Sequence, residues 1–115
     1  MIHYMKLNDK PFNLIKRRFK TYELRLFDEK RSKIEVGDYI EFTNRTDNNK
    51  QLLVEVVGIH RFKTFKDLYK DIPLERSGYL STELDNASHL DMLEFYDEHK
   101  QSLYGVVAIE IKLIK

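Results

Sequence analysis

Residues 20–27 of the chain are Lys-Thr-Tyr-Glu-Leu-Arg-Leu-Phe, and their alternation is the clearest structural signal in the sequence. Neighbouring side chains of a β-strand point to opposite faces, so residues two apart share a face. One face therefore carries Tyr22, Leu24 and Leu26, and the other carries Thr21, Glu23, Arg25 and Phe27. This pattern predicts a strand over residues 21–27, in which Glu23 and Arg25 lie about 6.6 Å apart along the chain.

Further strands are predicted on both sides of this stretch. Apolar and alternating runs bounded by turn residues indicate strands at His3–Leu7, Tyr39–Phe42, Leu52–Phe62 and Tyr104–Leu113. Gly58 predicts a bulge or bend within the long strand. The uninterrupted apolar run Val106–Ile109 predicts a strand that is buried on both faces.

Helices are predicted where capping residues precede apolar positions. Asn8 is a candidate N-cap for a helix with Pro11 in its first turn, and Thr64 is a candidate N-cap for a short helix over Phe65–Tyr69. Ser88 with Asp91 three residues later resembles a capping box and predicts a third helix. Residues 73–86 carry no regular pattern.

The predicted order is strand-helix-strand-strand-strand-helix-helix-strand, in one domain spanning residues 1–115. A doubly wound sheet needs helices alternating with strands throughout, and the centre of this chain lacks them. The order therefore predicts an α+β fold built on a small, partly closed β-barrel of about five strands with flanking helices.

Composition excludes several kinds of site. The 115 residues include no cysteine, so disulfides and thiolate chemistry are excluded, and the four histidines show no metal-ligand spacing. The four glycines are scattered singly, so no phosphate-cradling loop is expected, and there is no nucleophile elbow. We expect no metal, no cofactor and no membrane partner. Without a signal-peptide pattern, we expect a cytoplasmic location.

Charge is distributed unevenly along the chain. Residues 1–33 contain ten Lys and Arg against four Asp and Glu, a net charge of +6, although the whole chain has a net charge of +1. Lys16, Arg17 and Arg18 are candidates for contacts with a nucleic-acid backbone. The same three residues are also expected at the end of the first helix, where the helix dipole favours cations.

Lys20, Thr21, Glu23 and Arg25 form a candidate ligand-binding group. Arg25 is suited to bind a phosphate or carboxylate, and Glu23 to accept a hydrogen bond from the exocyclic amine of a base. Lys20 is suited to supply positive charge or, if desolvated, to act as a base. The alternative is a solvated strand face with ordinary surface ion pairs.

These residues also resemble a known family. Residues 15–26 are similar to the signature of the ASCH domain, which usually has a glycine, then Lys, then Glu-x-Arg. Residues 36–42 and 104–111 are similar to its second signature and its last strand. The resemblance implies a PUA-like fold with a cleft lined by Lys20, Glu23 and Arg25, and binding of RNA or a modified nucleoside.

The resemblance leaves two further functions open. One bacterial branch of the family is an amidohydrolase that acts on acetylcytidine, which would make Lys20 and Glu83 the catalytic candidates here. That branch has a threonine three residues after the lysine, where this chain has Glu23, and Arg18 replaces the usual glycine, so a side chain opposes a tight turn there. A protein-interaction domain is the third alternative.

Overall fold

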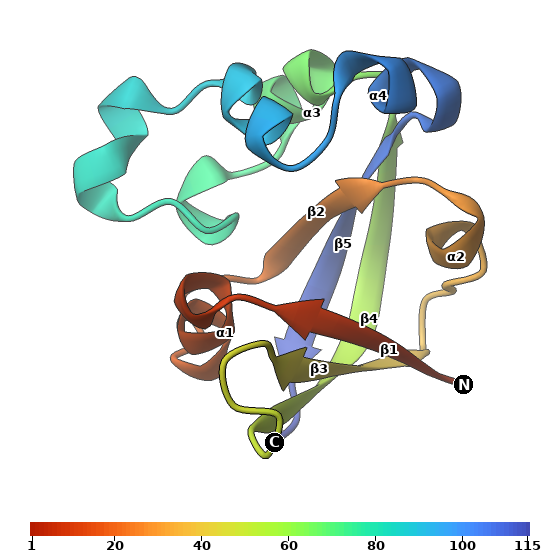
Figure 1. Cartoon of the computed structure of the whole chain (residues 1–115), viewed down its shortest axis with the longest axis vertical. Coiled ribbons are helices and arrows are strands. Elements are labelled where there is room, and N and C mark those ends of the chain that lie inside the picture. The colour runs from red at the N-terminus through yellow and green to blue at the C-terminus, as the bar shows by residue number, and fades with distance from the viewer.

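The computed structural model describes residues 1–115 and contains one sheet of five strands (Figure 1). The strands are β1 (Ile2–Leu7), β2 (Tyr22–Leu26), β3 (Tyr39–Asn44), β4 (Gln51–Phe62) and β5 (Val106–Leu113). Their order in the sheet is β1-β3-β4-β5-β2, with β1 and β3 parallel and the other neighbours antiparallel. The sheet curls into a half-barrel with flanking helices, which confirms the predicted α+β barrel.

The helices gather mostly on one side of the sheet, in the upper part of Figure 1. They comprise α1 (Asp9–Lys16), α2 (Glu29–Ser32), α3 (Phe65–Asp71), η1 (Leu74–Arg76), η2 (Ser81–Asn86), η3 (His89–Glu94) and α4 (Glu98–Tyr104), where η denotes a 3-10 helix. None of them is both long enough and apolar enough to cross a membrane.

Two of the three predicted caps form as expected. Thr64 Oγ1 accepts from the Asp67 amide at 3.2 Å, and Ser88 forms a capping box with Asp91. The helix that Ser88 opens is a 3-10 helix, and Asp97 caps the separate helix α4. Asn8 occupies the N-cap of α1 without a side-chain hydrogen bond.

Each face of the sheet is covered by its own apolar core. Val107 and Ile109 belong to the core inside the half-barrel, whereas Val106 and Ala108 belong to the core beneath α3 and η3. This division confirms the prediction that the last strand is buried on both faces. The predicted irregularity at Gly58 is also present, as a register shift between β4 and β5.

Side chains bridge the gap between the two edge strands, β1 and β2. Arg25 on β2 donates from Nη2 to the carbonyl oxygen of Lys6 on β1 at 3.1 Å. Lys30 Nζ donates to the carbonyl oxygen of Tyr4 on the same strand at 2.6 Å. An edge strand leaves its outward carbonyls without a backbone partner, so these two cations satisfy groups that a closed barrel would pair.

Candidate functional site

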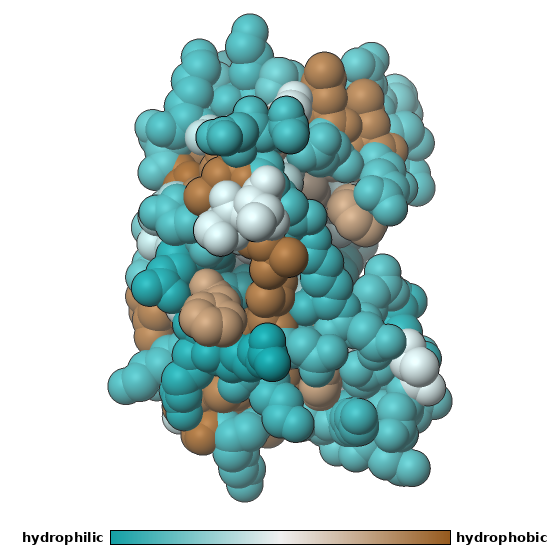
Figure 2. Space-filling view, turned by 90° about the vertical axis from the view of Figure 1, so that its left-hand side faces the viewer, coloured by the Kyte–Doolittle hydropathy of each residue, from teal (hydrophilic) through white to brown (hydrophobic).

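A hollow of about 860 Å³ lies between the half-barrel and the upper helical layer. Its lower wall comes from β1, α1 and the turn after β3, its floor includes β2, and its upper wall comes from residues 69–96. Figure 2 shows an indentation between the upper and lower parts of the molecule at the right-hand edge. This hollow contains several of the residues singled out from the sequence.

Lys20, Glu23 and Arg25 meet in this hollow as a hydrogen-bonded ion triad. Lys20 Nζ lies 2.7 Å from Glu23 Oε1. Arg25 contacts the other carboxylate oxygen, with Nε and Nη2 each 2.8 Å from Glu23 Oε2. Lys20 and Glu23 are buried. The shared strand face of Glu23 and Arg25 therefore points into the half-barrel, and it is not a solvated surface.

The two cations keep Glu23 ionised although it is buried. Burial alone would raise the pKa of a carboxyl group, because it disfavours the charged form. The attraction of Lys20 and Arg25 and their hydrogen bonds outweigh that penalty, so the pKa of Glu23 is lowered to about 2. In return, Glu23 raises the pKa of Arg25 against the opposing effect of burial. The triad is thus a fixed arrangement of charges at neutral pH.

A tight turn between α1 and β2 positions Lys20. The Phe19 amide donates to Leu14 O and the Arg18 amide to Ile15 O, both at 2.9 Å, which is the hydrogen-bond pattern of a Schellman motif. The motif needs a left-handed residue, and Arg18 adopts φ 67°. The side chain of Arg18 therefore does not prevent the turn, contrary to our expectation, although it adds backbone strain that glycine would avoid.

Gly78 covers Lys20 from the opposite wall. It adopts φ +113°, and a Cβ atom placed on it would lie 3.5 Å from Lys20 Nζ. The Thr21 amide donates to Arg76 O at 2.8 Å and so ties the same segment to the start of β2. Residues 76–78 thus hold the lysine in place beside Glu23.

A second ion pair spans the rim of the hollow. Lys10 Nζ on α1 lies 2.9 Å and 2.8 Å from the two carboxylate oxygens of Glu83 on η2. Glu83 also accepts from the Leu80 amide at 2.7 Å. The hydrogen bond from Lys10 is the main reason that the pKa of Glu83 is lowered. This pair connects helices that lie far apart in the sequence.

The upper wall is held together by hydroxyl groups and aromatic rings. Tyr79 donates to Asp91 Oδ2 at 2.7 Å, and its hydroxyl lies 2.8 Å from that of Tyr69 on α3. Burial, reinforced by these hydrogen bonds, raises the pKa of Tyr79. Tyr96 stacks on Phe65 of the upper core, with ring centroids 6.1 Å apart. In this wall, Tyr79 is held by hydrogen bonds of its hydroxyl group, and Tyr96 is held by the packing of its ring on Phe65.

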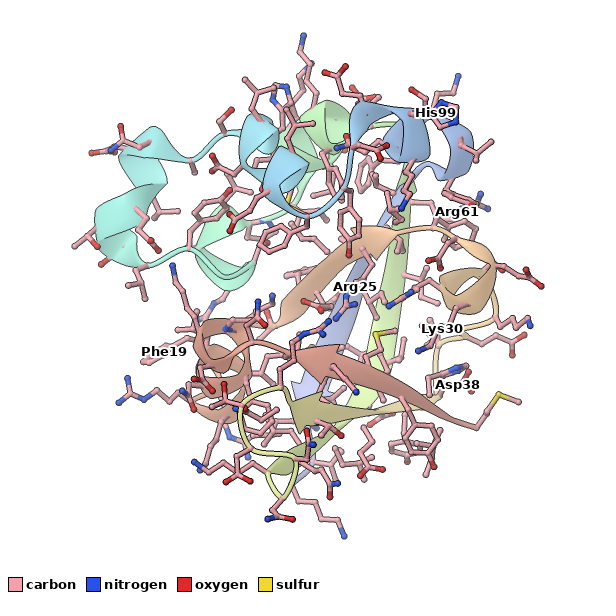
Figure 3. The ribbon with its side chains drawn as sticks, in the orientation of Figure 1. Phe19, Arg25, Lys30, Asp38, Arg61 and His99 are labelled. Carbon is pink, nitrogen blue, oxygen red and sulfur yellow. The ribbon has the colours of Figure 1, made fainter.

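Not every candidate from the sequence lies in the hollow. Lys20, Glu23, Arg25 and Glu83 line it, whereas the side chain of Thr21 does not. The candidate backbone contacts Lys16, Arg17 and Arg18 are exposed at the end of α1, outside the hollow. Figure 3 shows the neighbouring Phe19 pointing outward on that side, away from Arg25.

Sequence reasoning missed most of the other lining residues. They include the cations Lys6, Lys10, Arg31 and Arg45 and the aromatic residues Tyr79 and Phe95. These residues come from separate segments, and none belongs to a recognisable motif. The basic excess of residues 1–33 was the one available signal, and it covers only Lys6, Lys10 and Arg31.

Comparisons with known proteins identify the family and two similar structures. The ASCH domain family model matches residues 5–115. The crystal structure of the hypothetical protein PH0355 is 38% identical, with a TM-score of 0.82, and the match covers 99% of this chain and 100% of that one.

The solution NMR structure of protein PF0455 from Pyrococcus furiosus is also 38% identical, with a TM-score of 0.73, and the match covers 100% of this chain and 99% of that one. A comparison with curated proteins gave no match. The structure contains no group of three or more His, Asp or Glu side chains that could hold a metal ion. The chain belongs to the ASCH domain family, whose members are generally RNA-binding domains with a PUA-like fold.

Proposed function

We propose that the hollow is an RNA-binding site and that the Lys20–Glu23–Arg25 triad forms its specific contact surface. The observation that carries this proposal is the set of hydrogen-bond donors that the triad leaves unused. Lys20 Nζ has one protein partner, Glu23, although an ammonium group has three N–H donors. In Arg25, Nε and Nη2 make the contacts with Glu23 and Lys6 O, and Nη1 takes part in neither contact.

Unused donors on fixed cations favour a ligand that is rich in acceptors. Phosphate oxygens and the carbonyl and ring acceptors of bases meet this description. Glu23 orients both cations and offsets part of their charge, which favours recognition of a particular polar group over a general attraction to anions. The hollow as a whole is lined by six basic and four acidic residues, an excess that suits a polyanion.

Titration with short single-stranded RNA and with nucleosides, at low and at moderate salt, tests this proposal. We expect binding that weakens with salt and that Lys20→Ala strongly reduces. Lys16→Ala removes the same charge outside the hollow and is the matched control. Circular dichroism verifies that both variants fold. Absence of binding at both salt concentrations, or equal effects of the two variants, would contradict the proposal.

A second candidate, hydrolysis of acetylated cytidine-type nucleosides, is favoured by one observation: Lys20 and Glu83 line the same hollow. Two contacts weigh against it. The Lys20 ammonium group donates to Glu23, whereas a general base needs a free lone pair, and Glu83 is held by Lys10. Incubation with acetylcytidine tests this candidate, because its mechanism requires that Lys20→Ala abolish turnover. A cytoplasmic location stays a prediction for either function.

A further inference from the structure

Phe95 is an exposed aromatic side chain at the edge of the hollow. It is 59% exposed and lines the upper wall directly after η3. Its ring centroid lies 6.4 Å from that of Tyr96, which is itself stacked on Phe65 of the upper core. Tyr96 thus links Phe95 to the folded core, while most of the Phe95 surface stays open to a ligand.

The opposite wall carries two cations without side-chain partners. Lys6 lies on β1, and Arg45 follows β3, whose parallel pairing with β1 brings the two residues close together. The Arg45 amide donates to Leu7 O at 2.8 Å, which holds this corner in place. The other lining cations, Lys10, Lys20, Arg25 and Arg31, are paired with carboxylates.

The unpaired charges of the hollow are therefore separated. Glu94, the lining carboxylate without a partner, precedes Phe95 on the upper wall, whereas Lys6 and Arg45 lie on the lower wall. A phosphate group would be repelled at the Phe95 side and attracted at the Lys6 side. A flat, uncharged group would be accepted at Phe95, because all four RNA bases have a flat face that can stack on an aromatic ring.

We propose that the hollow takes a nucleotide of single-stranded RNA, with its base stacked on Phe95 and its phosphate held by Lys6 and Arg45. This inference rests on the proposed RNA-binding function and specifies the form of RNA and its orientation. Bases in a duplex are already stacked on their neighbours and cannot stack on a protein ring without being extruded. Lys6 and Arg45 thus replace Lys16, Arg17 and Arg18 as the expected phosphate contacts at this site.

Aromatic substitutions test the stacking contact. Phe95→Ala should weaken binding of short single-stranded RNA by about 5- to 100-fold, and Phe95→Trp should restore it. Phe19→Ala is the matched control, because Phe19 is 56% exposed and lies outside the hollow. A duplex of the same sequence should bind more weakly than the single strand and should be insensitive to Phe95→Ala.

Paired charge substitutions test the phosphate contact. The double variant Lys6→Ala/Arg45→Ala should reduce the slope of log K against log salt concentration by about 0.7, as expected for the loss of one phosphate contact with a single strand. The double variant Lys16→Ala/Arg17→Ala removes the same charge and should change the slope less. Both variants alter exposed side chains and should retain the wild-type circular dichroism spectrum.

The results separate this inference from the proposed function. If the wild type binds RNA and Lys20→Ala weakens binding, but Phe95→Ala and Phe19→Ala have equal effects, the stacking contact is wrong and the RNA-binding site stands. Duplex binding as tight as single-strand binding would overturn the inference in the same way. If the wild type binds neither RNA nor nucleosides, both proposals fail.

Discussion

The Lys20–Glu23–Arg25 triad and the Lys10–Glu83 pair line the same hollow, with nearly equal distances between charged atoms. The contacts measure 2.7 Å and 2.8 Å in the triad and 2.8 Å and 2.9 Å in the rim pair. Their surroundings differ, because the side chains of Lys20 and Glu23 are 8% and 4% exposed, whereas those of Lys10 and Glu83 are 51% and 38% exposed.

This difference indicates that distance alone does not determine what an ion pair contributes. In the buried triad each charge depends on its partner, because water cannot replace a lost contact. At the rim, water and salt compete for both charges, and holding two long side chains in one geometry costs entropy. We therefore expect the triad to be fixed while ligands exchange, and the rim pair to open readily for them.

The largest expected effect is that of Glu23→Gln, which removes the charge between the two cations. The buried Lys20 and the partly buried Arg25 would be left without a counter-charge, so the free energy of unfolding should fall by about 3–5 kcal/mol. Urea unfolding measures the change, and Glu83→Gln at the exposed rim pair is the matched control. If Glu23→Gln lost no more unfolding free energy than Glu83→Gln, burial would not make the triad more important for stability than the rim pair.

The next effect is a loss of stability in acid. The folded pKa of Glu23, about 2, lies below the ordinary value of 4.5, so its contribution to stability is fully present above about pH 4.5. That contribution should disappear as the pH falls toward 2 and should amount to about 3 kcal/mol. Unfolding free energies measured across this range should change less steeply in Glu23→Gln than in the wild type. If the unfolding free energy depended on pH in the same way in the wild type and in Glu23→Gln, that would be evidence against the lowered pKa of Glu23.

A smaller effect concerns the turn that delivers Lys20 to the triad. Arg18→Gly should raise the free energy of unfolding by about 1 kcal/mol, because glycine adopts φ 67° without the penalty of a side chain. Arg17→Gly removes the same charge at φ −83°, where glycine has no advantage, and should not stabilise the protein. Thermal or urea unfolding compares the two variants. If both variants changed the free energy of unfolding equally, loss of the charge, and not the backbone conformation of residue 18, would be the cause.

The smallest effect on stability is expected at the rim. Glu83→Gln should leave the unfolding transition within experimental error of the wild type. It should also increase RNA affinity modestly, because it frees Lys10 and removes a negative charge from the hollow. An amidohydrolase that uses Glu83 would instead lose activity toward acetylcytidine. Measuring both RNA binding and turnover in this variant distinguishes the two functions.

Local patterns accounted for much of the fold. The alternation of residues 21–27 assigned Glu23 and Arg25 to one face, and the caps Thr64 and Ser88 marked two helix starts correctly. The helix over residues 89–94 has 3-10 geometry, which its partial apolar pattern did not indicate. Capping and alternation depend on residues only a few positions apart, which explains why the sequence reveals them.

The candidate site divides in the same way. Sequence by itself determined the strand, the family and the order Lys20, Glu23, Arg25, since these follow from local spacing and a contiguous motif. Tertiary structure alone decided that Arg25 reaches Lys6 O, that Lys10 meets Glu83, and that Phe95 faces a hollow shared with Arg45. Those residues become neighbours only when the sheet curls and the helical layer closes over it, and no short-range pattern records how far the sheet curls.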